Sequence, residues 1–334
     1  MKLHLVFLRI LSILYFLPAL AYAQSSGRQK IDFDKSWKFH FGNAAKPEKD
    51  FNYSIATIFS KSGGAPTTAI DPKFKDNDWQ NVDVPHDWAV ALPFVNSTNF
   101  DVESHGYKPV GGLYPETSIG WYRKHFTVAK ADSGQRFQLQ FDGIFRDANI
   151  WVNGFYLGNN KSGYLGIEYD ITDFINYNGD NVIVVRADAT QYEGWFYEGA
   201  GIYRHVWLNT YQNLHIATDG VFAYSKVQNN KATVSVESTI INEANTGNNC
   251  MVNTFVSDRS GKIIGTANVQ PLALTINDSK TIKQTIDIPN PRLWNLEDPY
   301  LYRVVVEVKS GTKVIDTKTL RFGIRTIDIK TDGV

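Results

Sequence analysis

Acidic side chains are the most numerous groups in this sequence that could perform catalysis. The chain has 34 Asp and Glu residues among its 334. Two carboxyl groups on either side of a scissile bond can act as a general acid and as a base or nucleophile. With so many carboxylates, some pair always has a suggestive spacing, and no spacing here distinguishes an acid from its partner. The sequence alone therefore assigns no catalytic residue.

Metal, thiol and phosphate chemistry leave no recognisable pattern either. The seven His residues show no HExxH motif and no paired spacing. Cys250 is the only cysteine, which excludes a thiolate cluster and an intrachain disulfide. The sequence contains no glycine-rich phosphate loop and no GxSxG nucleophile motif. We therefore expect no metal ion and no cofactor.

The charge balance and the aromatic content narrow the class of partner. Lys and Arg number 34, equal to Asp and Glu, and no run of five or six like charges occurs. A nucleic acid is therefore not an expected partner. Aromatic residues form 13% of the chain, with eight Trp. Most should fill hydrophobic cores, but a sugar ring has apolar C–H faces and a rim of hydroxyls, so some Trp and Tyr side chains could bind carbohydrate.

Alternating apolar and polar residues indicate the elements that would position such side chains. Phe137, Leu139 and Phe141 alternate with Gln138 and Gln140, a period of two that is typical of a half-buried strand. No segment of 12 or more residues keeps a helical period. The pattern predicts an all-β protein built from antiparallel sandwiches. Further strands are expected at 150–152, 182–187, 205–208, 232–240, 251–256, 280–288, 301–308 and 314–322.

Two connections between these strands are distinctive. Asn153-Gly154 lies between the apolar runs 150–152 and 155–157, which favours a tight hairpin because a type I′ turn needs positive φ at both central residues. The long segment 44–72 contains Ser62-Gly63-Gly64-Ala65-Pro66, which cannot continue a strand. We expect this segment to be an insertion at the edge of a sandwich.

The composition changes near residues 209–220, where we place a domain boundary. Before it the chain is dense in Trp, Tyr and Gly, and after it Val, Ile and Thr alternate more plainly. The first unit covers residues 30–212. The second unit, 215–327, has the length and strand count of an immunoglobulin-like β-sandwich. Each unit is long enough to bury its own core.

Residues 1–23 have the pattern of a signal peptide. Lys2 and Arg9 accompany an apolar run at 3–20, and Ala21-Tyr22-Ala23 has the small residues of a cleavage site. A retained membrane anchor is the alternative, although Arg9 interrupts the run. No second apolar run of spanning length occurs. We expect a secreted or periplasmic protein with no membrane attachment after cleavage.

Several segments with distinctive residues follow one another in the first unit. They are Val84-Pro85-His86-Asp87-Trp88, Gly120-Trp121-Tyr122-Arg123-Lys124, Trp151-Val152-Asn153-Gly154, Tyr169-Asp170-Ile171-Thr172, Arg186-Ala187-Asp188 and Gly199-Ala200-Gly201-Ile202-Tyr203-Arg204. In order and spacing they resemble the first domain of family 2 glycoside hydrolases. This resemblance implies a jelly-roll β-sandwich at 30–212.

The second unit carries further segments of the same kind. They are Pro291-Arg292-Leu293-Trp294, Asp298-Pro299-Tyr300-Leu301-Tyr302 and Phe322-Gly323-Ile324-Arg325-Thr326-Ile327. They resemble the immunoglobulin-like domain of that family and the strand that leads to its catalytic barrel. The resemblance as a whole covers residues 30–330.

The resemblance implies sugar contacts for a few residues. In galactosidase-like members, loops of the first domain reach over the mouth of the barrel, and an acidic residue in an Arg-x-Asp pattern helps to hold the sugar. Asp188 matches that position, and a carboxylate there could accept hydrogen bonds from two hydroxyls. His86, Asp87 and Trp195 are further candidates for substrate contact. The turn at 85–88 could equally be a buried corner that satisfies its own hydrogen bonds.

Packing is the expected role of most other motif residues. Trp37, Trp151 and Trp207 should fill the first sandwich, and Trp294 with Tyr302 should anchor the second.

The resemblance also implies where catalysis takes place. Family members hydrolyse a β-glycosidic bond with retention, using two glutamates on a (β/α)₈ barrel of about 250 residues that follows these domains. Only the seven residues 328–334 follow Ile327. We expect them to begin a linker to a barrel that this chain lacks, so the chain alone should be inactive.

The implied function is that of the non-catalytic front part of a secreted β-galactosidase-like hydrolase acting on a β-linked glycan, with the barrel in cis. The long segment before Pro85 looks more like the galactosidase-type members. A β-glucuronidase or β-mannosidase parent, a stand-alone carbohydrate-binding protein and a purely structural pair of sandwiches are the alternatives. Assembly into a homo-oligomer stays open.

Overall fold

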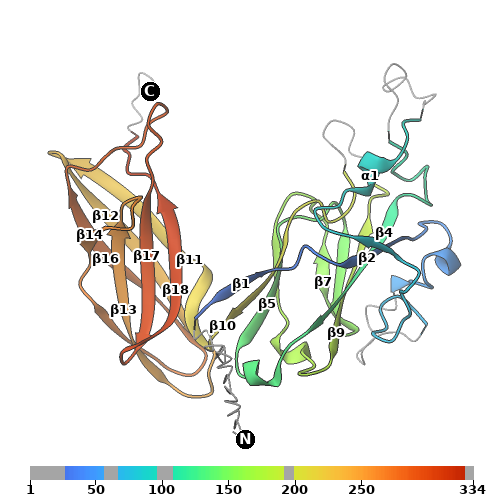
Figure 1. Ribbon diagram of the computed structural model, residues 1–334, viewed down its shortest axis with the longest axis horizontal. Helices are drawn as coiled ribbons and strands as arrows, with labels where there is room; N and C mark the ends of the chain where they lie inside the picture. The colour runs from blue at the N-terminus through green and yellow to red at the C-terminus, as the bar shows by residue number, and fades with distance from the viewer. Residues whose placement is uncertain (1–26, 56–66, 96–107, 192–198, 328–334) are drawn as a thin grey trace, which may run out of the picture.

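The computed structural model describes residues 27–55, 67–95, 108–191 and 199–327. Two β-sandwiches follow one another along the chain (Figure 1), and every strand pair within their sheets is antiparallel. This confirms the all-β expectation. The predicted signal peptide at 1–23 and Trp195 lie outside the described residues. None of the helices in the described ranges has the length and apolar character that a bilayer crossing requires.

The first sandwich, a jelly roll, pairs strands that are far apart in the sequence. Its four-stranded sheet has the order β1 (Gln29–Asp32), β10 (Val206–Tyr211), β5 (Arg136–Phe141) and β8 (Ile167–Asp170). Its six-stranded sheet has the order β3 (Gln80–Val82), β2 (Trp37–Phe41), β4 (Ile119–Thr127), β9 (Asp180–Asp188), β6 (Ala148–Val152) and β7 (Phe155–Asn160). Short helical turns connect them: η1 (Pro47–Lys49), α1 (Trp88–Ala91), η4 (Lys130–Asp132) and η5 (Thr172–Phe174).

The core of this sandwich lies between the two sheets. Trp37, Leu139 and Phe141 are buried there, in keeping with the alternation in β5. Strand β9, unlike β5, buries apolar residues on both faces. Ile183 and Val185 face this core, and Val182 and Val184 are buried on the opposite face. A strand covered on both faces loses its polar alternation. Something must therefore cover the outer face of the six-stranded sheet.

That cover is formed by residues 44–55 and 67–79, which we call the covering segment. Its Ile70 and Trp79 join a second hydrophobic cluster with Trp121, Trp151 and Val184 on the outer face of the six-stranded sheet. The expected insertion at a sandwich edge is right in that the segment joins β2 to the edge strand β3, and wrong in that its described residues lie over a sheet face. The stretch 62–66 lies outside the described residues. Trp151 was expected in the core of the sandwich and instead packs beneath this cover, its ring stacked 6.1 Å from that of Trp121.

The hairpin predicted at Asn153-Gly154 is confirmed. Val152 pairs with Phe155 across a two-residue turn, and the φ angles of Asn153 and Gly154 are 51° and 82°. Positive φ at both positions is what a type I′ turn requires. The Asn153 side chain also accepts a hydrogen bond from the Val182 amide at 2.8 Å, which ties the turn to β9.

The second sandwich, of immunoglobulin-like type, has one sheet of three strands and one of five. The first has the order β11 (Leu214–Gln228), β12 (Lys231–Asn242) and β16 (Asp278–Pro289). The other has the order β14 (Ile263–Thr266), β13 (Asn248–Ser257), β17 (Tyr302–Ser310) and β18 (Lys313–Phe322), and β15 (Gln270–Leu274) also pairs with β13. The inward residues Val234, Val252 and Val304 are fully buried between the sheets. Burial also raises the pKa of the Cys250 thiol.

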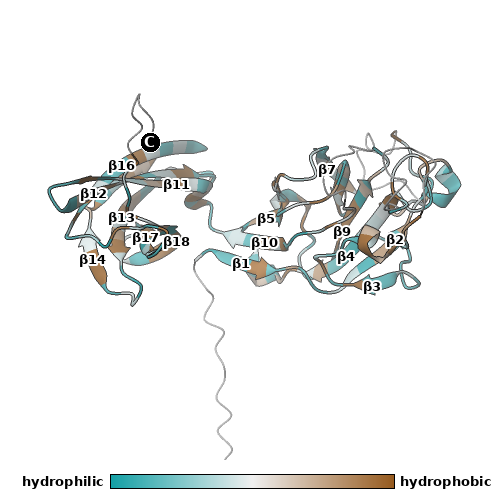
Figure 2. Ribbon diagram, turned by 90° about the horizontal axis from the view of Figure 1, so that it is seen from above, coloured by the Kyte–Doolittle hydropathy of each residue, from teal (hydrophilic) through white to brown (hydrophobic). Residues whose placement is uncertain are grey.

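The two sandwiches meet at a narrow junction near β1, β10 and the start of β11 (Figure 2). Arg28 crosses it, donating to a carboxylate oxygen of Asp316 at 3.0 Å and to the Ile216 carbonyl at 2.5 Å. Its guanidinium also lies 4.6 Å from the centre of the Tyr211 ring. Further contacts across the junction join Gln138 to Thr218 and Arg136 to Glu243.

Trp207 does not fill the first sandwich as expected. It is only half-buried, its indole N–H donates to Asp142 at 2.9 Å, and the Lys30 ammonium lies 4.1 Å from its ring centre. Because Trp207 and the inward Val206 and Leu208 alternate along β10, the Trp side chain falls on the outer face of the four-stranded sheet.

Candidate functional site

One end of the six-stranded sheet gathers three of the four residues predicted to contact sugar. Asp188, the last residue of β9, pairs with Ile119 at the start of β4, and its amide donates to the Arg146 carbonyl at 2.9 Å. The loop that holds Arg146 is joined in turn to Gly201 through backbone hydrogen bonds of Phe145. We call this end, which includes Asp188, Ile119, the 145–146 loop and Gly201, the rim. It lies near α1 in Figure 1.

His86 and Asp87 reach the same rim through a second set of backbone bonds. The His86 amide donates to the Ile202 carbonyl at 2.7 Å, and the Trp88 amide donates to the Ala200 carbonyl at 3.0 Å. The segment 199–202 therefore connects the His86–Trp88 turn to the loop beside Asp188. The fourth candidate, Trp195, belongs to the stretch 192–198, which is outside the described residues.

Asp188 is the rim carboxylate that is best placed to meet a ligand. Its side chain is 25% exposed. One carboxylate oxygen accepts from Arg186 Nη1 at 3.2 Å, and the other accepts from the amide and the hydroxyl of Thr190 at 3.1 and 2.6 Å. Because each carboxylate oxygen has two lone pairs, these contacts fix the orientation of the group and leave acceptor capacity toward solvent.

Arg186 connects Asp188 to a buried carboxylate in the covering segment. Its side chain is 8% exposed, and its Nε and Nη2 donate to Asp50 Oδ2 at 3.0 and 2.8 Å. The other oxygen of Asp50 accepts from Trp121 Nε1 at 2.6 Å. Burial raises the pKa of the Asp50 carboxyl, and the charge of Arg186 opposes that effect. Asp50, Arg186 and Asp188 thus form one continuous charged chain from the covering segment to the rim.

Asp50 was not identified from the sequence. It lies in a segment with no periodicity and is 136 residues from its partner Arg186. Arg186 itself belongs to the Arg-x-Asp pattern, so its position in the motif was visible while its partner was not.

His86 is half-buried and packs against the core at the rim. Its Nδ1 lies 2.8 Å from the Tyr122 hydroxyl, and its ring centre lies 4.8 Å from that of Phe39. Burial lowers the pKa of His86, which favours the neutral imidazole at neutral pH. The surroundings of His86 therefore suit a packed, hydrogen-bonded ring as well as a ligand contact.

Asp87 joins two backbone segments at the rim. One of its carboxylate oxygens accepts from the Ala89 amide, where Asp87 is the N-cap of α1, and from the Ala200 amide, both at 3.0 Å. Burial raises the pKa of this carboxyl. An N-cap carboxylate that accepts two backbone bonds has a clear structural role.

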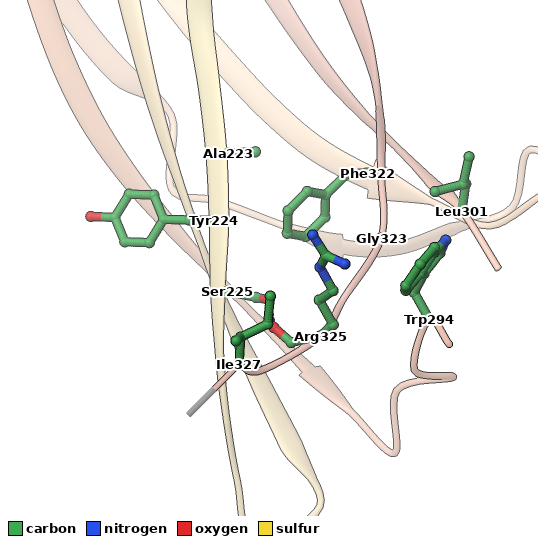
Figure 3. Close-up of a pocket in the computed structure, with 9 residues that line it drawn as sticks. All are labelled: Ala223, Tyr224, Ser225, Trp294, Leu301, Phe322, Gly323, Arg325 and Ile327. Carbon is green, nitrogen blue, oxygen red and sulfur yellow. Dashed lines mark hydrogen bonds between the residues drawn. The ribbon is translucent and has the colours of Figure 1, made fainter. Parts of the chain in front are cut away.

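The second sandwich has a pocket of its own, with a volume of about 510 Å³. In Figure 3, Trp294 and Leu301 lie on one side of the pocket and Ser225 lies on the other. Phe322 and Arg325 lie between the two sides, and the Tyr224 ring is directed away. Its lining residues are Ala223, Tyr224, Ser225, Trp294, Leu301, Phe322, Gly323, Arg325 and Ile327. None of them is a carboxylate and none is a predicted sugar contact.

The two aromatic residues expected to anchor the second sandwich have different positions. Tyr302 is buried in its core, and its hydroxyl accepts from the Arg292 amide at 2.8 Å. Trp294 is half-buried at the pocket, with the Arg325 guanidinium 4.9 Å from its ring centre. Only Tyr302 therefore belongs to the core.

Within the described ranges, no group of three or more His, Cys, Asp or Glu side chains is arranged to hold a metal ion.

Two family models match the chain in sequence. The model "Glycosyl hydrolases family 2, sugar binding domain" matches residues 67–212, and the model "Glycosyl hydrolases family 2" matches residues 214–325. The first match includes Asp188 and the motif residues of the rim. The second includes the pocket residues from Ala223 to Arg325.

The chain is also similar to two curated glycosidases and to a solved structure. The chain is 31% identical over 306 residues to the β-galactosidase BoGH2A of Bacteroides ovatus, covering 91% of this chain and 32% of that protein. It is 29% identical over 305 residues to a β-glucuronidase of Formosa agariphila, covering 85% of this chain and 30% of the relative. The crystal structure of a glycosyl hydrolase family 2 member from Bacteroides cellulosilyticus superposes with a TM-score of 0.74 at 28% identity, over 91% of this chain and 37% of that one. The chain spans about a third of the length of the curated relatives it matches.

Proposed function

Because this chain belongs to glycosyl hydrolase family 2, we propose that it forms the sugar-binding and immunoglobulin-like part of a secreted, retaining β-glycosidase of the β-galactosidase kind. In this proposal the catalytic glutamates are on a barrel that is outside these 334 residues. The chain itself supplies the rim, which closes one side of the sugar site. The match to the B. ovatus β-galactosidase supports the galactoside.

The observation that carries the proposal is the position of Asp188. Its carboxylate is partly exposed at the end of a rigid sheet, and Arg186 and Thr190 fix its orientation. A fixed carboxylate of this kind can accept hydrogen bonds from sugar hydroxyls, and the bonds are stronger than neutral ones because the acceptor is charged. No reorientation is needed when the sugar binds, so little of the binding free energy is lost to ordering the protein.

The charge at the rim favours a neutral sugar over a uronic acid. The F. agariphila relative is a β-glucuronidase, and a glucuronide carries a carboxylate that an enzyme must pair with a cation. The guanidinium beside Asp188 already pairs with two carboxylates, Asp50 and Asp188. A second negative charge near Asp188 would be repelled, so the pair of Arg186 and Asp188 favours a neutral β-glycoside, such as a galactoside, over a glucuronide.

Assays on the complete gene product test this proposal. We expect hydrolysis of the nitrophenyl β-glycosides with the highest kcat/KM for the galactoside, and a lower value for the glucuronide and the mannoside. The 334-residue chain by itself should give no turnover, since the proposal places the two carboxylates for retaining hydrolysis on the barrel. A complete product that hydrolyses none of the three, or hydrolysis by this chain that is lost when one of its own acidic residues is replaced, would overturn the proposal. Sequencing the N-terminus of the exported protein checks cleavage after Ala23.

A further inference from the structure

We propose that Arg186 and Asp50 are positioning residues for substrate recognition: together they hold the Asp188 carboxylate at the rim in the orientation that accepts a sugar hydroxyl. This inference rests on the proposed role of Asp188 as a sugar contact. It assigns a function in specificity to Asp50 of the covering segment.

The geometry divides the donors of Arg186 between two carboxylates. Nε and Nη2 both donate to Asp50, at 3.0 and 2.8 Å, and Nη1 remains for Asp188 at 3.2 Å. The longer single contact is the weaker one. Asp50 therefore takes most of the interaction with the guanidinium, and Asp188 receives one directional bond.

This division explains why Asp188 can stay partly exposed. A buried guanidinium needs a counter-charge, because an unpaired buried charge is costly. Asp50 supplies that charge from inside, with a side chain that is 4% exposed. Without Asp50, Asp188 would be the only carboxylate bonded to Arg186, and it would turn inward to pair with the cation. Its oxygens would then be less available to a ligand.

Asp50 is itself held in place by groups of the sheet and the cover. Trp121 Nε1 donates to its second oxygen at 2.6 Å, and Arg186 lies 4.3 Å from the centre of the Tyr53 ring. The side chain of Asp50 thus cannot rotate without breaking bonds on both oxygens. A rigid inner carboxylate gives Arg186, and through it Asp188, a fixed position.

A neighbouring ion pair offers a matched control. Arg123 of β4 is fully buried on the same outer face, and its Nε donates to Asp76 of the covering segment at 2.8 Å. Like Asp50 with Arg186, Asp76 neutralises a buried guanidinium beneath the cover. Within the described residues, the hydrogen bonds of Arg123 go to Asp76 and to backbone carbonyls of the covering segment, and none goes to Asp188. Replacing Asp76 therefore removes a comparable stabilising pair and leaves the neighbours of Asp188 unchanged.

The test measures discrimination between nitrophenyl β-galactoside and each of its monodeoxy analogues by the complete enzyme. For the wild-type enzyme, removing the hydroxyl that Asp188 binds should lower kcat/KM about tenfold to hundredfold. We call this ratio the preference for the hydroxyl. Asp188→Asn should abolish most of it. The positioning variants should lower the same preference by about threefold or more, while preference at the other hydroxyls is kept. The variants are Asp50→Asn, Arg186→Lys and Thr190→Val, with Asp76→Asn as the control.

A purely structural role for Asp50 and Arg186 predicts a different result. Asp76→Asn should lower the melting temperature and keep the wild-type preference for the hydroxyl. If Asp50→Asn and Arg186→Lys behave like Asp76→Asn in both measurements, the positioning role is overturned and the sugar contact of Asp188 stands. If Asp188→Asn itself keeps every preference, the sugar contact fails and the positioning role fails with it. Should Asp50→Asn not fold, Arg186→Lys decides, because it keeps the buried charge and loses the two-bond fork.

Discussion

Trp121 and Arg186 lie directly opposite each other in the pairing of β4 with β9, and both donate to the carboxylate of Asp50. Two adjacent strands thus hold one residue of a segment that has no strand of its own. The described residues of the covering segment pair with no strand of the sheet, and ladder pairing resumes only at β3, which follows it. Side-chain contacts therefore hold the segment on the sheet: these bonds, the Arg123–Asp76 pair and the apolar cluster beneath the cover.

Asp188→Ala in the complete enzyme should lower kcat/KM by about tenfold to hundredfold, or roughly 1.5 to 3 kcal/mol of transition-state binding for a lost charged hydrogen bond. The melting temperature should change little, because Arg186 keeps its two bonds to Asp50. Steady-state kinetics and thermal unfolding of the same purified protein check both points. Normal kinetics combined with reduced stability would show that Asp188 is structural.

Asp316→Asn should destabilise the chain strongly. The Asp316 side chain is fully buried, accepts from Arg28 at 3.0 Å and also accepts from the Ile216 amide at 2.7 Å. Removing its charge leaves Arg28 without a counter-charge at the junction, which costs about 3 to 5 kcal/mol for a buried pair. Urea unfolding at neutral pH measures the loss.

The control for this change is Asp287→Asn, which breaks an ion pair of similar length with Lys231, at 2.9 Å, but between side chains that are more than half exposed. Exposed pairs contribute little to stability, so unfolding of this variant should match wild type. Equal losses for the Asp316 and Asp287 variants would contradict the buried character of the junction.

The free energy of unfolding should fall with acidification partly through His215. Burial, with the nearby charge of Arg28, lowers the pKa of this imidazole to about 4 from 6.5. Between those values the unfolded chain binds a proton that the folded chain does not, so stability is complete above about pH 6.5 and is lost as the pH falls toward 4. The His215 contribution is about 3 kcal/mol over that range.

Chemical unfolding at several pH values measures the effect against His215→Gln. The carboxylates titrate in both proteins, so the difference between their pH slopes isolates His215. The variant should show the shallower slope between pH 6.5 and 4. Identical slopes would mean that the pKa of His215 is the same in the folded and the unfolded chain.

Gly120→Ala should destabilise the rim by overpacking. A Cβ atom at this position would lie 2.3 Å from Cζ3 of Trp88, a ring that is only 2% exposed. Adding a methyl group to such a packed site costs about 1 to 3 kcal/mol. Gly112→Ala is the control, because the nearest atom to its added Cβ is the Thr190 carbonyl oxygen at 3.6 Å. Thermal unfolding should separate the two variants, and equal melting temperatures would show that Trp88 can shift freely.

The strands and the tight hairpin were predictable because both depend on local signals. A period of two places β5 and β12, and Asn153-Gly154 supplies the positive φ angles of its turn. The covering segment was misplaced because its anchoring bonds are not local: Asp50 meets Arg186 across 136 residues. No spacing rule connects such a pair, and no period marks the segment.

The Trp residues show the same limit. Trp151 and Trp207 were both assigned to the core of the first sandwich, yet Trp151 lies beneath the covering segment and Trp207 on the outer face of the other sheet. Hydrophobicity predicts that a large ring is buried and does not say against which layer. The three described sugar-contact candidates were found through a resemblance of motifs, and their gathering at one rim depends on backbone bonds between loops.

The covering segment also bears on how such a domain can change over evolutionary time or be rebuilt by design. Deleting it would uncover Trp121 and Trp151 and leave two guanidinium groups, those of Arg123 and Arg186, without Asp76 and Asp50. A chain without this segment would also need polar or smaller residues in place of Trp121 and Trp151, because the uncovered rings would form an exposed apolar patch, so the segment and the sheet positions beneath it must change together. A designer who grafts the jelly roll elsewhere must transfer the segment and both cations together.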